Sequence, residues 1–302
     1  MSKPLSHLRA IAYAFMAYSL WVLADSLTKL AGQAHVPFWQ IIEFMSLSSA
    51  ITIIIITAYR KQLRNLVPKR YGLETLRSCI TLLLAVTYVV VFTHLPLTNV
   101  YVVIFFAPML IALFAAQLMH EHVSRRLALA IMAGFIGVVI AINPMTLDLH
   151  GGALVGYIAL PVCLILYVVQ MLMMRFISRT EHSESMACFP QLFRVVVLLP
   201  FCLWKFTPLT MIEWAWLIGL GVLSAVGWLL ISAAIKHAPA AVVTPLQYTQ
   251  IVSGAIMGYL IWDDVPTWHM VVGAAIIVAS GIYMAQHTHH RSRRLADQAL
   301  PT

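Results

Sequence analysis

Long apolar runs separated by short polar connections occupy almost the whole chain. A helix that crosses the hydrocarbon core of a membrane needs about 20 mainly apolar residues. By this measure we expect ten membrane-spanning helices, at residues 8–31, 37–58, 74–93, 97–118, 125–143, 152–174, 186–205, 212–235, 240–261 and 268–286. Only the connections 59–73 and 175–185 have any length, so the pattern predicts an all-α membrane protein without a separate soluble domain.

Composition agrees with this pattern. The 302 residues are 61% hydrophobic and 10% charged, with a mean hydropathy of +0.88, whereas a soluble domain has about 25% charged residues. The net charge of +8 comes from short basic clusters between apolar runs rather than from one amphipathic face. We therefore expect the lipid bilayer, and not nucleic acid, to be the partner of these clusters.

The positions of lysine and arginine predict the orientation. With the N-terminus in the cytoplasm, the expected cytoplasmic side collects Lys3, Arg9, Arg60, Lys61, Arg64, Lys69, Arg70, Arg77, Arg125, Arg126, Arg175, Arg179, Lys236, Arg291, Arg293 and Arg294. The opposite side collects Lys29 and Lys205. Since basic residues concentrate in cytoplasmic connections, both termini are predicted to be cytoplasmic.

Two stretches of the chain, His94 to Ile142 and His237 to Ala285, have similar sequence patterns. Each begins with His-x-Pro, continues as an apolar run, reaches an acidic turn at Glu121 or Asp264, and closes with a glycine-bearing apolar run. Weak internal similarity of this kind is typical of membrane proteins built by duplication.

Ten helices divide into five plus five. Because each half then has an odd number of helices, the second half must insert in the opposite orientation, which gives an inverted repeat. We predict a first five-helix repeat at 1–146, a second, inverted five-helix repeat at 147–287, and a basic cytoplasmic tail at 288–302.

With this architecture, the chain resembles the drug/metabolite transporter superfamily, in particular its EamA-type members. The likeness lies in Asp25-Ser-Leu-Thr-Lys29, Pro108, Glu121, Gly134 and Gly137, with Asp264, Gly273 and Gly281 as second-half counterparts. The resemblance implies ten helices in two five-helix repeats, and export of amino acids or related metabolites more often than uptake. Many relatives look to have an arginine in the second helix, where this chain has Glu43-Phe44-Met45; Arg194 lies in the counterpart helix 186–205.

Four ionisable residues are candidates within the membrane: Asp25, Lys29, Glu43 and Arg194. Such groups are costly in hydrocarbon and usually face a partner or an aqueous cavity. Asp25 and Lys29 are four residues apart on one helical face, so they could form a structural ion pair or contact the substrate directly. Glu43 lies about two turns into its helix, where it could bind a cation or carry a proton, or reach interfacial water.

Arg194 is the strongest candidate for substrate recognition. An arginine keeps its charge at any relevant pH and offers a planar fork that suits a carboxylate or a phosphate. The competing interpretation is a permanent ion pair with Glu43, because helices 37–58 and 186–205 occupy equivalent places in the two repeats.

The helix at 240–261 is polar in its middle, where Gln247, Tyr248 and Gln250 follow Pro245. The equivalent part of helix 97–118 is aromatic and apolar and contains Tyr101 and Phe105. We expect a pocket with one polar and one aromatic wall, to which Pro245 adds a loosened backbone. Additional candidates for the lining, each also suited to ordinary packing, are Trp21, Tyr167, Gln170 and Trp228.

No cofactor or metal is expected. The histidine groups His120-Glu-His122 and His287, His289 and His290 lie at predicted membrane ends, where polar residues are usual. The four cysteines have no metal-ligand spacing.

The sequence predicts a secondary active transporter of the bacterial inner membrane that moves a small organic metabolite by alternating access. An amino acid or a related zwitterion fits the candidate residues, and export is the expected direction. The alternatives are a membrane-embedded enzyme and a non-transporting scaffold that act on or with lipid; a catalytic signature such as HExxH or a Ser/His/Asp arrangement is missing from the sequence. Both a monomer and a homodimer are compatible with it.

Overall fold

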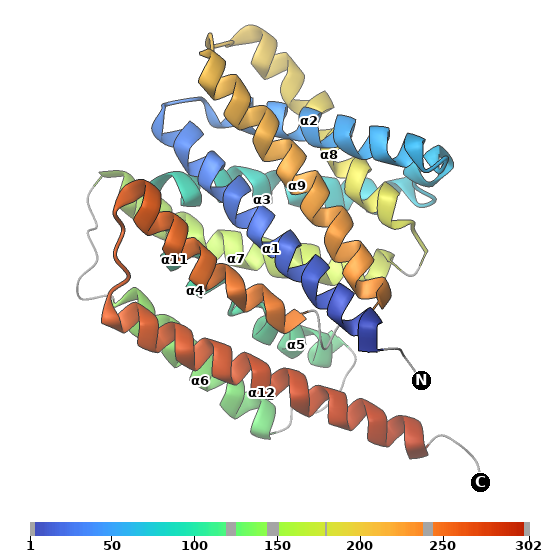
Figure 1. Cartoon of the computed structure of the whole chain (residues 1–302), viewed down its shortest axis with the longest axis vertical. Coiled ribbons are helices and arrows are strands. Elements are labelled where there is room, and N and C mark those ends of the chain that lie inside the picture. Colours follow the sequence, from blue (N-terminus) through green and yellow to red (C-terminus); the bar gives the residue numbers. More distant parts are fainter. Residues whose placement is uncertain (1–3, 119–124, 144–150, 179, 238–243, 299–302) are drawn as a thin grey trace.

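The computed structural model describes residues 4–118, 125–143, 151–178, 180–237 and 244–298, and within these ranges all regular structure is helical (Figure 1). The first part of the chain forms α1 (Pro4–Gln33), α2 (Phe38–Tyr59), the short η1 (Leu63–Leu66), α3 (Tyr71–His94), α4 (Leu97–Ile104), α5 (Ala107–Leu118) and α6 (Arg125–Ile142). The second part forms α7 (Gly151–Ile177), α8 (Ser183–Trp204), α9 (Met211–His237), the short η3 (Thr244–Tyr248), α11 (Thr249–Trp262) and α12 (Trp268–Gln298).

Six helices of the described part are long and apolar enough to cross a membrane. They cover Leu8–Gln33, Phe38–Tyr59, Tyr71–His94, Gly151–Met174, Ser183–Trp204 and Met211–Ala234. Shorter apolar helices cover Leu97–Ile111, Ala128–Ile142 and Trp268–Tyr283. The prediction of an all-helical, multi-pass membrane protein is therefore confirmed for these residues.

Two of the predicted helices are interrupted. The expected helix 97–118 breaks between Ile104 and Ala107, just before Pro108, because a proline has no N–H for the helical hydrogen bond of the preceding turn. Of the expected helix 240–261, residues 240–243 lie outside the described part, and the rest consists of the 3-10 turn η3, which contains Pro245, followed by α11. A third difference is at the end of the chain, where α12 continues to Gln298 through most of the predicted tail.

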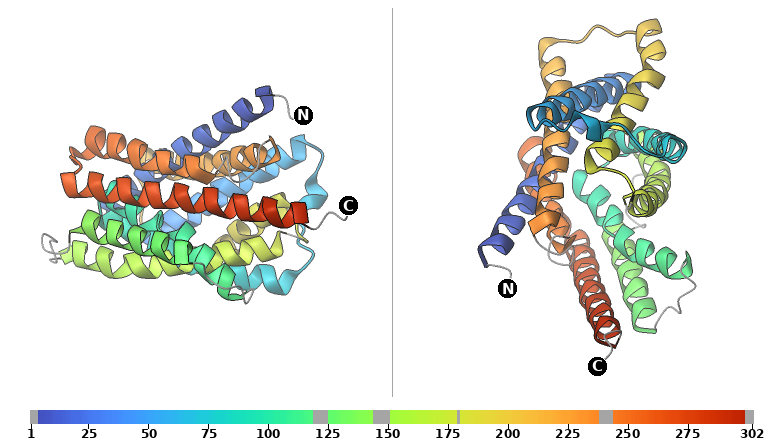
Figure 2. Two further views of the ribbon diagram at one scale, coloured as in Figure 1. Left: turned by 90° about the horizontal axis from the view of Figure 1, so that it is seen from below. Right: turned by 90° about the vertical axis from the view of Figure 1, so that its right-hand side faces the viewer.

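The helices pack in pairs that join distant parts of the chain. α1 runs along α9, α3 runs along α7, and α6 runs along α12, while α2 contacts both α8 and α9 (Figure 1). A turn of the view shows that α1 begins and α12 ends at one end of the bundle, where the basic connection between α2 and α3 also lies (Figure 2). Large apolar side chains such as Ile55, Phe135 and Val196 are exposed, as expected for surfaces in contact with lipid.

The contact between α6 and α12 depends on glycine. A Cβ added to Gly273 would overlap the backbone of Gly137 and Ala141, whereas a Cβ added to Gly72 in α3 would meet nothing within 4 Å. We expect Gly273→Ala to lower the free energy of unfolding by about 1–3 kcal/mol, because the two helices must move apart. Gly72→Ala should leave stability unchanged or raise it by about 0.5–1 kcal/mol. Thermal unfolding in detergent measures both, and equal stabilities would contradict this packing.

Candidate functional site

A cavity of about 330 Å³ lies at the centre of the bundle, lined by residues of α1, α2, α3, α4, α7, α8, α9, η3 and α11. Its volume falls within the range of about 300–1,000 Å³ that is usual for small-molecule sites. On α1 the lining residues Tyr18, Trp21, Asp25 and Thr28 are spaced by three or four, so one face of this helix forms the wall. Both halves of the chain contribute to this cavity.

Most of the candidates derived from the sequence line this cavity. They are Trp21, Asp25, Tyr101, Phe105, Tyr167, Gln170, Arg194, Trp228, Gln247 and Gln250. Tyr101 and Phe105 have nearly parallel rings, with centroids 5.7 Å apart. The expected aromatic wall from α4 and polar wall from η3 and α11 therefore do lie together.

Three candidates lie elsewhere. Tyr248 packs its ring edge-to-face on Phe105 and belongs to the central apolar cluster. Glu43 is buried, but it lies two positions from the lining residue Met45 and thus on another face of α2. Lys29 lies one helical turn beyond Asp25 and contacts the connection between α11 and α12.

The expected ion pair between Asp25 and Lys29 is wrong. The Lys29 ammonium instead lies 3.1 Å from Oδ2 of Asp264 and 4.2 Å from the ring centre of Trp262. The indole N–H of Trp262 donates to Oε1 of Gln33 at 2.6 Å. Trp262 at the end of α11 and Asp264 in the following connection thus hold α1 in place at this end.

Asp25 has two tyrosine partners instead. The hydroxyl of Tyr88 in α3 donates to Oδ1 at 2.8 Å, and the hydroxyl of Tyr101 in α4 donates to Oδ2 at 2.5 Å. Asp25 is 5% exposed and lines the cavity. It is thus held in place by neutral donors from two other helices.

Arg194 is buried in α8 and lines the cavity. Within the described residues the ion pairs join Lys29 to Asp264 and Glu74 to Arg77, so the alternative pairing of Arg194 with Glu43 is wrong. The Nε of Arg194 also has no hydrogen-bond partner among these residues. A guanidinium in this position carries a charge that no described carboxylate neutralises.

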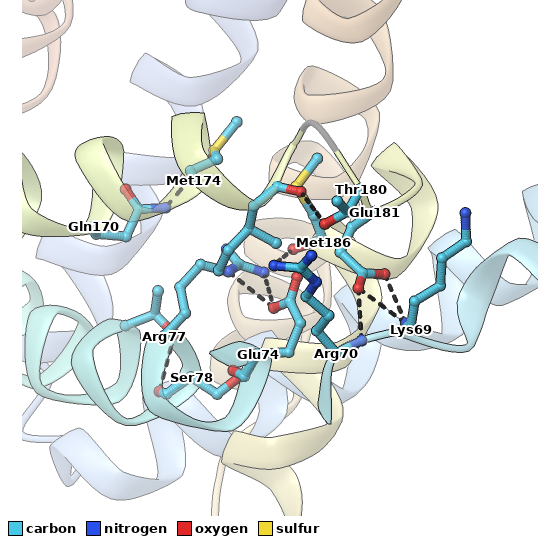
Figure 3. Close-up of polar contacts among 12 residues, drawn as sticks. Lys69, Arg70, Glu74, Arg77, Ser78, Gln170, Met174, Thr180, Glu181 and Met186 are labelled. Atoms are coloured by element: carbon cyan, nitrogen blue, oxygen red, sulfur yellow. Dashed lines mark hydrogen bonds and ion pairs between the residues drawn. The ribbon is translucent and has the colours of Figure 1, made fainter. Parts of the chain in front are cut away.

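One charged pair at the cavity was missed in the sequence. Nε and Nη2 of Arg77 donate to Oε2 of Glu74 at 2.9 and 2.7 Å, and Nη2 also donates to the backbone oxygen of Met186 at 2.7 Å (Figure 3). The pair is almost fully buried, whereas the distribution of basic residues in the sequence places Arg77 on the cytoplasmic side. The spacing Glu-x-x-Arg within the first turns of an apolar helix was the available signal.

A second contact nearby ties two connections together. The carboxylate of Glu181, between α7 and α8, accepts hydrogen bonds from the backbone N–H groups of Lys69 and Arg70, just before α3 (Figure 3). Arg77 joins α3 directly to α8, and Glu181 joins the residues just before α3 to the connection just before α8. They fix one end of the cavity.

Several lining residues carry buried polar atoms without a partner among the described residues. These atoms are Oγ of Ser49, Oε1 of Gln170, Oε1 of Gln191, Nε of Arg194, Nε1 of Trp228 and Nε2 of Gln247. Buried polar groups normally have hydrogen-bond partners, because desolvation without one costs about 1–3 kcal/mol each. Side chains that line the cavity therefore include both unsatisfied donors and unsatisfied acceptors.

The histidines that could be considered as metal ligands lie largely outside the part of the chain that the structure describes. His120 and His122 lie in the gap 119–124, and the side chains of His287, His289 and His290 are also not described. Among the residues that the structure describes, no three His, Cys, Asp or Glu side chains are grouped as metal ligands would be.

Comparison with known proteins shows similarity to a family of transporters. Residues 154–285 match the EamA-like transporter family. A pseudopaline exporter of Pseudomonas aeruginosa is 24% identical over 280 residues, covering 91% of this chain and 95% of the exporter. These matches support a place for the chain in the drug/metabolite transporter superfamily.

Further relatives extend the match over most of the chain. A riboflavin transporter of Vibrio cholerae is 27% identical and covers 81% of this chain and 83% of its own length. An S-adenosylmethionine uptake transporter of Rickettsia prowazekii is 25% identical over 64% of each chain. A crystal structure with 15% identity covers 90% of this chain and 94% of its own, with a TM-score of 0.66, and shows the fold. The relatives are transporters of small metabolites and not enzymes, which supports a transporter role for this chain.

Proposed function

We propose that this drug/metabolite transporter is a secondary active permease that exports a small organic metabolite bearing a carboxylate, such as an amino acid or a related zwitterion. The observation that carries the proposal is the unneutralised Arg194 guanidinium in a cavity lined by both halves of the chain. Because a buried arginine retains its charge and suits bidentate contact with a carboxylate, an anionic group of the substrate is its natural partner.

Alternating access requires two halves that can rock about a central site. We therefore propose ten spanning helices in two inverted five-helix repeats, at residues 1–146 and 147–287. The pattern of helix contacts supports this arrangement. In a two-fold relation between the repeats, the counterparts of α1, α2, α3 and α6 are α7, α8, α9 and α12. This relation converts the contact between α1 and α9 into the contact between α7 and α3, and both are present. The α2–α8 and α6–α12 contacts exchange with themselves, as a two-fold relation requires.

We further propose that both termini are cytoplasmic and that the membrane is the bacterial inner membrane. The basic connection between α2 and α3 lies at the same end of the bundle as the start of α1 and the end of α12 (Figure 2). This is the arrangement that the positive-inside rule favours. The end that holds Lys29 and Asp264 is then the external one, and these residues must separate when the cavity opens outward.

The test uses full-length protein in proteoliposomes, with the native cysteines replaced and cysteines introduced as Lys29→Cys and Asp264→Cys. We expect flux of at least one amino acid or S-adenosylmethionine through the unmodified protein. A short bis-methanethiosulfonate cross-linker should stop flux through the double variant, because it prevents the external end from opening, and reduction should restore it. Each single-cysteine variant, treated in the same way, is the control. Full flux through the cross-linked protein would contradict alternating access at this end, and no flux of any metabolite would contradict transport.

A further inference from the structure

The carboxyl group of Asp25 lies in the wall of the cavity and can accept more hydrogen bonds than it does. A carboxylate has about four acceptor positions, and Tyr88 and Tyr101 each use one, on different oxygens. Because these tyrosines come from α3 and α4, the carboxylate of α1 is held by two other helices and cannot rotate freely. Its remaining acceptor positions are fixed with it.

The nearby basic side chains are engaged elsewhere. Lys29 is bound to Asp264 and to the ring of Trp262, and Arg77 is bound to Glu74 and to the Met186 carbonyl. Of the described residues that line the cavity, Asp25, Arg77 and Arg194 are charged by type. Since Arg77 is neutralised by Glu74, the cavity presents one unmatched carboxylate, Asp25, and one unmatched guanidinium.

These two charges do not satisfy one another. No nitrogen of Arg194 lies within the 4.0 Å of the Asp25 oxygens that would define an ion pair among the described residues. Isolated buried charges are costly, and each favours a partner of opposite sign. A ligand whose anionic group reaches Arg194 and whose cationic group reaches Asp25 would supply both partners and would itself be neutral overall.

Aromatic rings near Asp25 favour the same kind of ligand. Trp21 lies one turn before Asp25 on the lining face of α1, and the ring of Tyr101 carries the hydroxyl that binds the carboxylate. The face of an aromatic ring attracts an ammonium group, by about 0.5–2 kcal/mol depending on desolvation. A carboxylate that shares the cavity wall with aromatic residues is therefore suited to a primary or substituted ammonium.

We propose that Asp25, positioned by Tyr88 and Tyr101, is the subsite for the cationic group of the substrate, so that the cavity selects zwitterions with the carboxylate at Arg194 and the ammonium at Asp25. This inference rests on the proposed transport function. It makes Asp25 a specificity-determining residue rather than half of a structural pair.

The test is ligand binding to the full-length protein in nanodiscs, measured by calorimetry with matched sets of compounds. One set is phenylalanine, phenylpropionate and phenethylamine; another is leucine, isocaproate and isoamylamine; the remaining common amino acids and S-adenosylmethionine complete the panel. In the wild-type protein we expect a zwitterion to bind at least about 10-fold more tightly than its deaminated acid. Asp25→Asn should remove this preference while it leaves the affinity for the acid within about 2-fold, since only the ammonium contact is lost.

The control is Asp263→Asn, the same chemical change at an exposed position outside the cavity, where the left-handed backbone, φ 55°, also accepts asparagine. It should leave the preference intact. Because the readout is the ratio of two affinities, a general loss of stability in Asp25→Asn does not imitate the result.

Three outcomes would overturn the subsite. The first is equal affinity of the wild-type protein for the acid and the zwitterion. The second is equal weakening of both by Asp25→Asn, which would make Asp25 a structural or proton-carrying group. The third is binding of the acids alone. If no compound of the panel binds, the carboxylate anchor at Arg194 and the proposed function fail as well.

Discussion

Replacement of Arg194 by glutamine should weaken substrate binding by about 100-fold, which corresponds to about 2.8 kcal/mol. The variant removes the guanidinium that no described carboxylate neutralises, so the carboxylate of the substrate would be buried without its partner. Arg194→Lys should recover only part of the affinity, because an ammonium cannot make the bidentate contact. Calorimetry on protein in nanodiscs measures these affinities.

The matched control for this prediction is Arg64→Gln. Arg64 is exposed in η1, outside the cavity, so the same substitution should leave binding unchanged. Equal affinities of the wild-type and Arg194→Gln proteins for the substrate would show that the anion lies elsewhere.

The second large effect is expected on stability. Glu74→Gln leaves Arg77 buried at 1% exposure without its carboxylate, and breaking a buried ion pair in this way costs about 3–5 kcal/mol. The double variant Glu74→Leu with Arg77→Met should be more stable than Glu74→Gln, because it removes both charges. Denaturation in mixed detergent micelles measures the free energies of unfolding.

The control for the buried pair is Glu213→Gln, since Glu213 is only partly buried and its side chain accepts an exposed hydrogen bond from the backbone N–H of Thr210. Glutamine can make the same contact, so its stability should be close to that of the wild type. If Glu74→Gln unfolds at the same detergent fraction as this control, the pair contributes nothing to stability.

The lengths and positions of the helices were largely predictable because each depends on a local property, the length of an apolar run. The predicted helix 37–58 differs from α2 by one residue at each end. The interruptions before Pro108 and at Pro245 had a signal in the prolines themselves, but where the backbone departs from the helix depends on neighbouring helices as well.

The partners of charged residues were less predictable. Asp25 and Lys29 share a helical face, but Lys29 binds Asp264, 235 positions away in the chain, and such a contact follows only from how α1 meets the α11–α12 connection. The burial of Arg77 likewise depends on the Met186 carbonyl of α8. Composition and spacing identify which residues are able to recognise a substrate, and long-range packing decides which of them reach the cavity.

The most direct measurement of the central claim is counterflow of radiolabelled substrate into proteoliposomes that contain equal amounts of folded wild-type, Arg194→Gln or Arg64→Gln protein. We predict that the wild type and Arg64→Gln accumulate label at equal rates and that Arg194→Gln accumulates it at least about 10-fold more slowly at a substrate concentration below the wild-type KM. Equal rates for all three proteins would contradict recognition of the transported molecule by Arg194 in the central cavity.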